Sequence, residues 1–243
     1  MRRTPVRGDG LLSAAAAVAV AAALVLALVV APQDGVQGVA QRLMYVHVPA
    51  AWVAYLAFAT VLVSSVLYLV RRELRWDRYA QAAAELGVGL TALAIALGML
   101  WGRPVWGVWW TWDARLVTTA VLLLVYVAYL GVRRTADDPH VAARRSAAVG
   151  IVAFLNVPVV HFSVVWWRTL HQPPTVLGPE GSPPIHPTMA WALATGVVAF
   201  TLLAVLVVRR RVARLGAEAA DPAAVPPGRE APPVVTVVPR AGR

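Results

Sequence analysis

Six long apolar segments constrain the fold of this chain more than any other feature of its sequence. Each has close to the roughly 20 residues that a helix needs to cross about 30 Å of hydrocarbon. They lie at about 11–31, 48–70, 82–101, 116–132, 146–162 and 189–208. Charged residues make up only 14% of the chain, which excludes an ordinary water-soluble globule. The sequence therefore predicts an all-α polytopic membrane protein, a bundle of six transmembrane helices.

The two ends of the chain need separate interpretation. Arginines precede the first apolar segment, as in a secretory signal, but the segment is long for a signal core, so we expect it to be retained as a helix. The last part of the chain is rich in Pro and Ala and cannot bury a core. We therefore expect one membrane domain, 1–210, followed by a disordered cytoplasmic tail, 211–243.

Arginine is distributed unevenly between the two sets of loops. Fifteen arginines lie before the first segment, between segments two and three, between segments four and five, or directly after segment six. The alternate loops contain four, which are Arg42, Arg103, Arg115 and Arg168. Because cytoplasmic loops carry the positive excess, we expect both termini in the cytoplasm and the loops 32–47, 102–115 and 163–188 on the outward side.

Several classes of function are excluded by composition. The net charge of +10 is explained by the attraction of basic loops to anionic lipid, so no nucleic-acid partner is inferred. The chain has no cysteine, which excludes disulfides, thiolate metal sites and cysteine nucleophiles. It has no G-x-x-x-x-G-K-[ST] motif either, so we expect neither ATP binding of that type nor enzymatic activity.

Tryptophan is concentrated on the predicted outward side. Seven of the ten tryptophans lie in or beside two outward loops, whereas a belt that only anchors helices populates both membrane faces. The densest segment joins the third and fourth apolar segments, and we expect it to be helical from Pro104. Four residues would then share one face and form an aromatic shelf. They are Trp106, Trp109, Trp110 and Asp113, with Trp101 and Trp112 nearby.

The charged residues of this segment have open roles. Arg115, with Arg103 or Arg168, supplies guanidinium groups suited to carboxylates. Asp113 is either a helix-terminal acid or an acid paired with an arginine of another segment, because an acid and a base two residues apart do not face each other on a helix.

Two histidines flank the tryptophan-rich segment from separate outward loops. His47 and His171 are placed so that two imidazoles can reach one planar metal complex from opposite faces. The alternative for His47 is an interfacial histidine at the start of a helix, beside Pro49. Both roles stay open on the residues alone.

The other three histidines are interpreted as structural or solvated. We expect His161 to be a packing residue supported by Asn156 after a kink at Pro158, and a reserve ligand at most. His186 lies in a Pro-rich stretch and His140 in a charged cytoplasmic turn, so both are expected to be solvated.

The string Trp101-Gly-x-x-x-Trp-Gly-x-Trp-Trp-x-Trp-Asp-Ala-Arg115, placed between two outward histidines, resembles the haem-handling family of cytochrome c biogenesis, most closely the CcmC family. The resemblance covers about residues 11–210. It implies a periplasmic tryptophan-rich domain that holds haem b non-covalently, with His47 and His171 as axial ligands of the iron. The other implied cofactor contacts are Trp101, Trp106, Trp109, Trp110, Trp112, Asp113 and Arg115.

The resemblance also implies partners and a location. Haem would pass to the periplasmic haem chaperone CcmE, alongside the ATP-binding subunit CcmA, the membrane subunit CcmB and the small subunit CcmD, in the cytoplasmic (inner) membrane. The Pro-rich stretch after His171 and the tail depart from the family pattern. The larger haem-attaching relatives are longer, so the length favours the small haem-delivery member.

Three alternatives remain at the level of the sequence. A quinone-reactive membrane b-type cytochrome usually has paired histidines within its spans, and segments one to four contain none. An assembly subunit that does not bind haem would use the tryptophan-rich loop only to dock a partner. A low-affinity zinc or copper site built from His47, His171 and Asp113 fits by ligand type but explains none of the tryptophans.

Overall fold

A computed structural model describes residues 9–167, 169–171 and 185–220. These residues fold into helices joined by short connections, with one isolated β-bridge between Asp34 and Gly38. The helices are α1 (Asp9–Val25), a π-helical turn (Leu26–Val30), a 3-10 helix (Val39–Leu43), α2 (Met44–Arg71), α3 (Leu74–Trp106), α4 (Ala114–Val132), α5 (Pro139–Phe154), α6 (Asn156–Trp166) and α7 (Pro187–Ala220). The predicted all-α class is confirmed.

Among the described residues, six helical segments are long and apolar enough to cross a membrane, as predicted. They are Asp9–Val30, Val39–Arg71, Leu74–Trp106, Ala114–Val132, Pro139–Trp166 and Pro187–Ala220. Several of these helices are longer than the apolar segments in the sequence, because helical turns with polar residues extend beyond the apolar part of each span. The chain is therefore a multi-pass membrane protein.

The fifth span is interrupted, as the proline in it predicts. Helix α5 ends at Phe154 and α6 begins at Asn156. Pro158 has no N–H to donate to the carbonyl of Phe154 one turn earlier, so the helical hydrogen-bond ladder is broken there.

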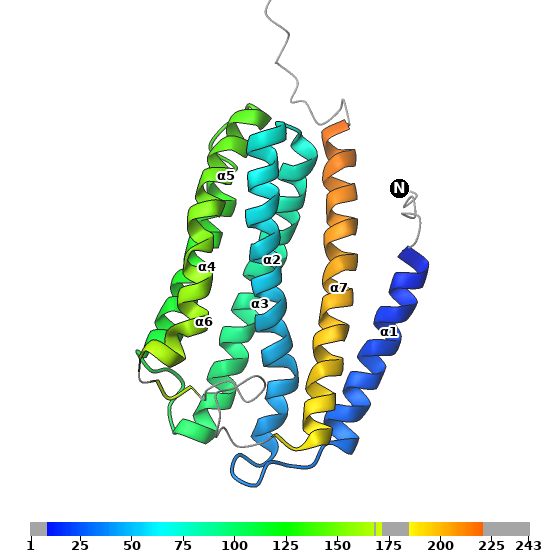
Figure 1. Ribbon diagram of the computed structural model, residues 1–243, viewed down its shortest axis with the longest axis vertical. Coiled ribbons are helices and arrows are strands. Elements are labelled where there is room, and N and C mark those ends of the chain that lie inside the picture. Colours follow the sequence, from blue (N-terminus) through cyan, green and yellow to red (C-terminus); the bar gives the residue numbers. More distant parts are fainter. Residues whose placement is uncertain (1–8, 168, 172–184, 221–243) are drawn as a thin grey trace, which may run out of the picture.

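Helix α2 lies at the centre of the bundle, packed against α3, α5 and α7 (Figure 1). Helix α1 lies at one edge beside α7, and α4 to α6 lie at the other side. The α2–α3 contact is close because Gly87 faces Phe58: a Cβ at Gly87 would come within 2.5 Å of the Phe58 ring. The Phe58 ring also stacks on Tyr126, with ring centroids 3.7 Å apart.

Ion pairs tie the helices together at the end of the bundle where α2 turns into α3. Arg133, the residue that directly follows α4, donates two hydrogen bonds to Asp77 of α3, at 2.8 and 2.5 Å, and both side chains are nearly buried. Arg211 of α7 donates to both carboxylate oxygens of Glu85 of α3. The loops at this end alternate in sequence with those at the other end, as the six-span topology requires.

The division into a membrane domain and a tail at residue 211 stays a prediction. Helix α7 continues past this position to Ala220, and Arg211 pairs with Glu85 on α3 and with Glu218 on its own helix. The remainder of the predicted tail, 221–243, lies outside the described residues.

Candidate functional site

His47 and His171 lie close together at the end of the bundle opposite the Asp77–Arg133 pair. Their ring centroids are 6.4 Å apart, and the ring planes are inclined by 35°. His47 is on the first turn of α2, because this helix begins at Met44 rather than at residue 48. It is therefore held by a helix and not by a loop as predicted, whereas His171 lies in the connection that follows α6.

The imidazole of His47 is confined by α3. The Trp101 ring meets it edge-on, with centroids 5.9 Å apart, and the backbone of Gly98 lies beside it, so that a Cβ at Gly98 would be 3.3 Å from His47 Cε1. The Nδ1 atom of His47 is buried and lies on the side of the ring that packs against α3, 3.7 Å from the position that a Cβ at Gly98 would take.

Trp106 extends this arrangement on the other side. Its ring centroid lies 6.4 Å from that of His171. Trp101, His47, His171 and Trp106 thus form a continuous row of rings, here called the His–Trp row. Two of its members come from the last turns of α3, so α3 and the first turn of α2 position most of the row.

The predicted helix from Pro104 through Asp113 is wrong. Helix α3 ends at Trp106 because Gly107 adopts a positive φ of 78°, a conformation that glycine permits and that ends helices. The N–H of Gly107 donates to the carbonyl of Arg103, and the Arg103 side chain donates to the carbonyl of Gly107. Pro104 therefore lies in the last turn of α3 and not at the start of a new helix.

The aromatic shelf is consequently divided. Trp106 belongs to the His–Trp row, whereas the other three tryptophans lie in the irregular loop 107–113. Trp109 and Trp112 are 51% and 85% exposed, and the Trp110 ring meets the Trp112 ring edge-on at 5.9 Å. The loop thus exposes large aromatic side chains on the surface of the protein. Trp101 is anchored instead, because its indole N–H donates to Gln37 at 2.8 Å.

Asp113 is the N-terminal cap of α4. One carboxylate oxygen accepts from the backbone N–H of Leu116 at 3.0 Å, and the other accepts from the hydroxyl of Thr111 at 3.0 Å. Of the two structural roles left open by the sequence, the helix-terminal one is observed.

Two arginines of the site donate hydrogen bonds to backbone carbonyls. Arg115 donates to the carbonyls of Val160 and His161 and so ties α4 to α6. Arg103 closes the end of α3. Arg168 lies outside the described residues.

The remaining histidines do not join the His–Trp row. His161 is exposed on α6 and packs against Tyr55 and Phe162. Asn156 does not support it as predicted, because its amide donates to the carbonyl of Thr118 on α4.

His186 and His140 are exposed, as predicted, but each has a structural contact. The Nδ1 atom of His186 lies 2.7 Å from the Thr188 hydroxyl at the start of α7. His140 accepts a hydrogen bond from Tyr68 at its carbonyl.

Within the described part of the chain, no group of three or more His, Asp or Glu residues is arranged to hold a metal ion. Asp113, which the zinc or copper alternative requires as a third ligand, is used as a helix cap. The described site therefore provides two imidazoles surrounded by aromatic rings, and not a set of three or more protein ligands for a free metal ion.

Sequence reasoning missed Gly98 and Gln37, which position His47 and Trp101. The only signal for Gly98 was a glycine inside an apolar helical segment, a pattern that often reflects close packing. No signal pointed to Gln37, because its pairing with Trp101 joins residues 64 positions apart.

Known proteins resemble this chain over most of its length. The sequence profile of the family described as Heme exporter protein C, CcmC, matches residues 7–220. The Heme exporter protein C of Bradyrhizobium diazoefficiens is 40% identical over 194 residues, 76% of this chain and 73% of that protein. The protein of the same name from Escherichia coli K12 is 35% identical over 163 residues, 67% of this chain and 66% of that protein.

A ccmC-like mitochondrial protein of Marchantia polymorpha, described as a cytochrome c biosynthesis protein, is 40% identical over 151 residues, 62% of this chain and 64% of that protein. With a profile match that includes all six spans and the whole His–Trp row, the chain belongs to the CcmC family of heme exporter proteins.

Proposed function

We propose that this chain binds haem b non-covalently where His47 and His171 meet, and delivers it for the assembly of c-type cytochromes. The observation that carries the proposal is the 6.4 Å separation of the two imidazole centroids, reached from different parts of the chain. Membership of the heme exporter protein C family supports it.

The spacing suits two imidazoles on one iron. A metal–imidazole nitrogen bond is about 2 Å long, so two rings bound to opposite sides of one metal have centroids on the order of 6 Å apart. The porphyrin supplies the other four nitrogens, so the chain needs to provide no third ligand. Each of the two imidazoles would supply one nitrogen, and haem iron accepts histidine nitrogen as an axial ligand.

The tryptophans would contribute apolar contact with the porphyrin. Trp101 and Trp106 flank the two imidazoles, and Trp109, Trp110 and Trp112 present further ring surfaces from the adjoining loop. Each aromatic contact of this kind contributes on the order of 1 kcal/mol beyond the area it buries. Because these rings are exposed, one edge of the bound haem would stay accessible to the protein that receives it.

The propionates require cations. We assign this role to Arg115, whose guanidinium is already oriented by two carbonyls of α6 and retains donors for a carboxylate. Asp113 acts indirectly, by capping the helix on which Arg115 lies.

The orientation follows from the arginines. The sequence has fifteen arginines in the segments predicted to be cytoplasmic and four in the alternate loops. By the positive-inside rule, this bias favours a His–Trp row at the periplasmic face of the inner membrane and both termini in the cytoplasm. Haem would then be handed to the periplasmic chaperone CcmE. The absence of an ATP-binding motif from the sequence fits a division of labour with CcmA, CcmB and CcmD.

The test is the absorption spectrum of the full purified chain reconstituted with haem. The wild type is expected to show a low-spin spectrum, and both His47→Ala and His171→Ala are expected to lose it and to transfer less haem to CcmE. His186→Ala is the matched control, because His186 lies in the same predicted outward loop as His171 and its ring lies against Thr188 rather than in the His–Trp row.

Unchanged low-spin spectra in both variants would reject the ligand assignment. Absence of haem binding in the wild type, with normal assembly of the partner complex, would instead favour an assembly subunit. Quinol oxidation by the purified chain would favour a b-type cytochrome.

A further inference from the structure

Trp101 connects the loop between the first two spans to one of the two proposed haem ligands. Its indole N–H donates to the side-chain oxygen of Gln37 at 2.8 Å, and its ring meets the His47 imidazole edge-on, with centroids 5.9 Å apart. Gln37 precedes the 3-10 helix, whereas His47 is on the first turn of α2 and Trp101 is near the end of α3. A residue outside the His–Trp row thus holds a ring inside it.

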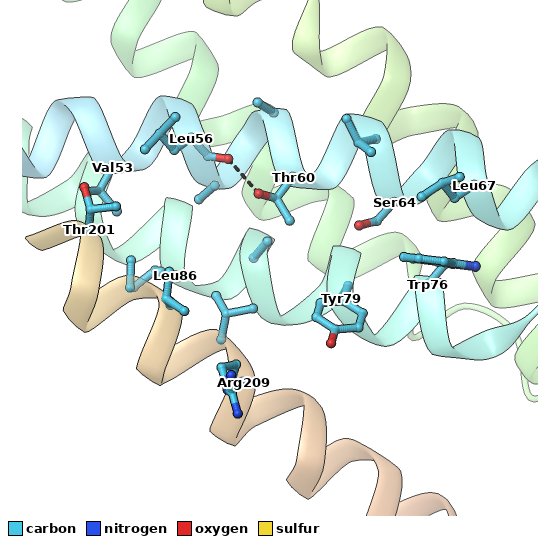
Figure 2. Close-up of a pocket in the computed structure, with 17 residues that line it drawn as sticks. Val53, Leu56, Thr60, Ser64, Leu67, Trp76, Tyr79, Leu86, Thr201 and Arg209 are labelled. Carbon is cyan, nitrogen blue, oxygen red and sulfur yellow. Dashed lines mark hydrogen bonds between the residues drawn. The ribbon is translucent and has the colours of Figure 1, made fainter. Parts of the chain in front are cut away.

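The packing of the spans is not tight along their whole length. A hollow of about 590 Å³ lies between α2, α3 and α7 (Figure 2). The described residues that line it, among them Val53 on α2 and Leu86 on α3, include no member of the His–Trp row. The row takes its local contacts from the helix ends and the loops beside them, and the loop that carries Gln37 is one of these.

The position of Gln37 is set by a tight turn around Asp34, here called the Asp34 turn. One carboxylate oxygen of Asp34 accepts from the backbone N–H groups of Val36 and Gln37, at 2.9 and 2.7 Å. The Asp34 carbonyl accepts from the N–H of Gly38 at 3.0 Å. Gly38 has a φ of 56° and a ψ of −138°, a conformation that glycine adopts at little cost. The turn therefore restrains the Gln37 backbone at its own N–H and at that of the next residue.

The bond to Gln37 restricts rotation of the Trp101 ring. An indole N–H is a donor only, so the Gln37 oxygen determines the direction in which this edge of the ring points. Loss of the acceptor would leave a partly buried N–H without this bond and would free the ring to turn about its side-chain bonds. The His47 imidazole contacts α3 at Trp101 and at the backbone of Gly98, so one of these two contacts would be loosened.

We infer that Gln37 is a positioning residue of the haem site, which acts through Trp101 on the orientation of His47, and that the Asp34 turn holds it in place. The effect on haem rests on the proposed function. The contact between Gln37 and Trp101 is present in the chain without haem, so it can be tested separately.

The first test is haem titration of the full purified chain. Gln37→Leu removes the acceptor at nearly constant size and should weaken haem binding about 5-fold, the order expected for one net hydrogen bond. Gln37→Glu keeps an oxygen acceptor and should bind haem like the wild type. Gln33→Leu is the matched control, because Gln33 is exposed in the same loop, and it should also bind like the wild type.

The second test needs no haem. In the chain labelled with nitrogen-15 at its indole groups, NMR in detergent resolves tryptophan N–H signals, and the Trp101 signal is the one missing from Trp101→Phe. This signal should shift in Gln37→Leu and in Asp34→Ala. It should stay in place in Gln33→Leu and in Asp34→Asn, which keeps an acceptor for the two backbone N–H groups. A Trp101 signal that Gln37→Leu does not move would overturn the inference.

A double-mutant cycle shows whether Gln37 acts through Trp101. Trp101→Phe has no indole N–H, so adding Gln37→Leu should cause no further loss of haem affinity. Equal haem affinity of Gln37→Leu and the wild type, or losses that add in the double variant, would overturn the inference and leave the haem site as proposed. A wild type that binds no haem would reject the proposed function itself, and with it the role of Gln37 at a haem site, whatever the Trp101 signal shows.

Discussion

The imidazole of His47 rests against the backbone of Gly98, where an added Cβ would lie 3.3 Å from Cε1 and 3.7 Å from Nδ1. Gly98→Ala is therefore expected to displace the ring by a few tenths of an ångström. Because residues that orient a metal ligand affect metal binding strongly, haem affinity should fall about 10-fold. Titration of the purified chain with haem, followed by its absorption, measures the change.

Gly89→Ala is the control for this prediction. Gly89 lies on the same helix with open space around its Cα, so both variants gain up to about 1 kcal/mol of helix propensity, but only Gly98→Ala crowds His47. Equal haem affinity in the two variants would show that Gly98 does not position the imidazole.

Substitutions of Asp113 distinguish a capping role from a direct role in haem binding. Asp113→Asn keeps an acceptor for the N–H of Leu116 and should preserve both stability and haem binding. Asp113→Ala removes the cap and should cost about 1 kcal/mol of stability, with weaker haem binding through the displaced Arg115. Thermal unfolding and haem titration of the two variants provide the measurement, and loss of haem binding by a stable Asp113→Asn protein would indicate direct contact.

The Asp77–Arg133 pair is expected to be important for stability. Its side chains are only 12% and 11% exposed, so Asp77→Asn leaves an uncompensated guanidinium in the bundle and should destabilise the protein by about 3–5 kcal/mol. The double variant Asp77→Asn with Arg133→Met should recover part of this loss. Unfolding in detergent measures both.

An exposed ion pair provides the comparison. Glu73 and Arg75 are about half exposed, so Glu73→Gln should change stability by less than about 1 kcal/mol. Similar losses for Glu73→Gln and Asp77→Asn would contradict the importance of burial.

The cap of α5 should make its first turn sensitive to acid. The backbone N–H groups of Val141 and His140 donate to Asp138 and lower the pKa of this carboxyl below its ordinary value of 3.8. The folded state thus favours the ionised form, so the cap stabilises above that ordinary pKa and is lost as the pH falls through the lowered one.

The advantage of the wild type over Asp138→Ala should accordingly shrink between pH 5 and pH 3, as measured by circular dichroism during heating. Asp138→Asn, which caps without titrating, should keep a constant advantage over the alanine variant. A wild-type advantage that is independent of pH would argue against the ionised cap.

The sequence by itself determined the class of fold and the approximate spans. Apolar segments of membrane-crossing length form helices in lipid, because a helix satisfies its backbone hydrogen bonds within the segment. Six such spans are observed among the described residues. The interruption near Pro158 was predictable for the same local reason, a missing N–H. The side of the bundle that carries the candidate site followed from the positions of His47, His171 and the tryptophans in alternate loops.

Only the tertiary structure decided how these residues meet. The left-handed conformation of Gly107 ended α3 and divided the tryptophans, although the spacing alone favoured a continuous helix. The 6.4 Å approach of His47 to His171 and the close contact with Gly98 depend on the packing of separate segments. Local periodicity records which face of a helix is apolar, whereas the distance between two faces depends on every side chain packed between them.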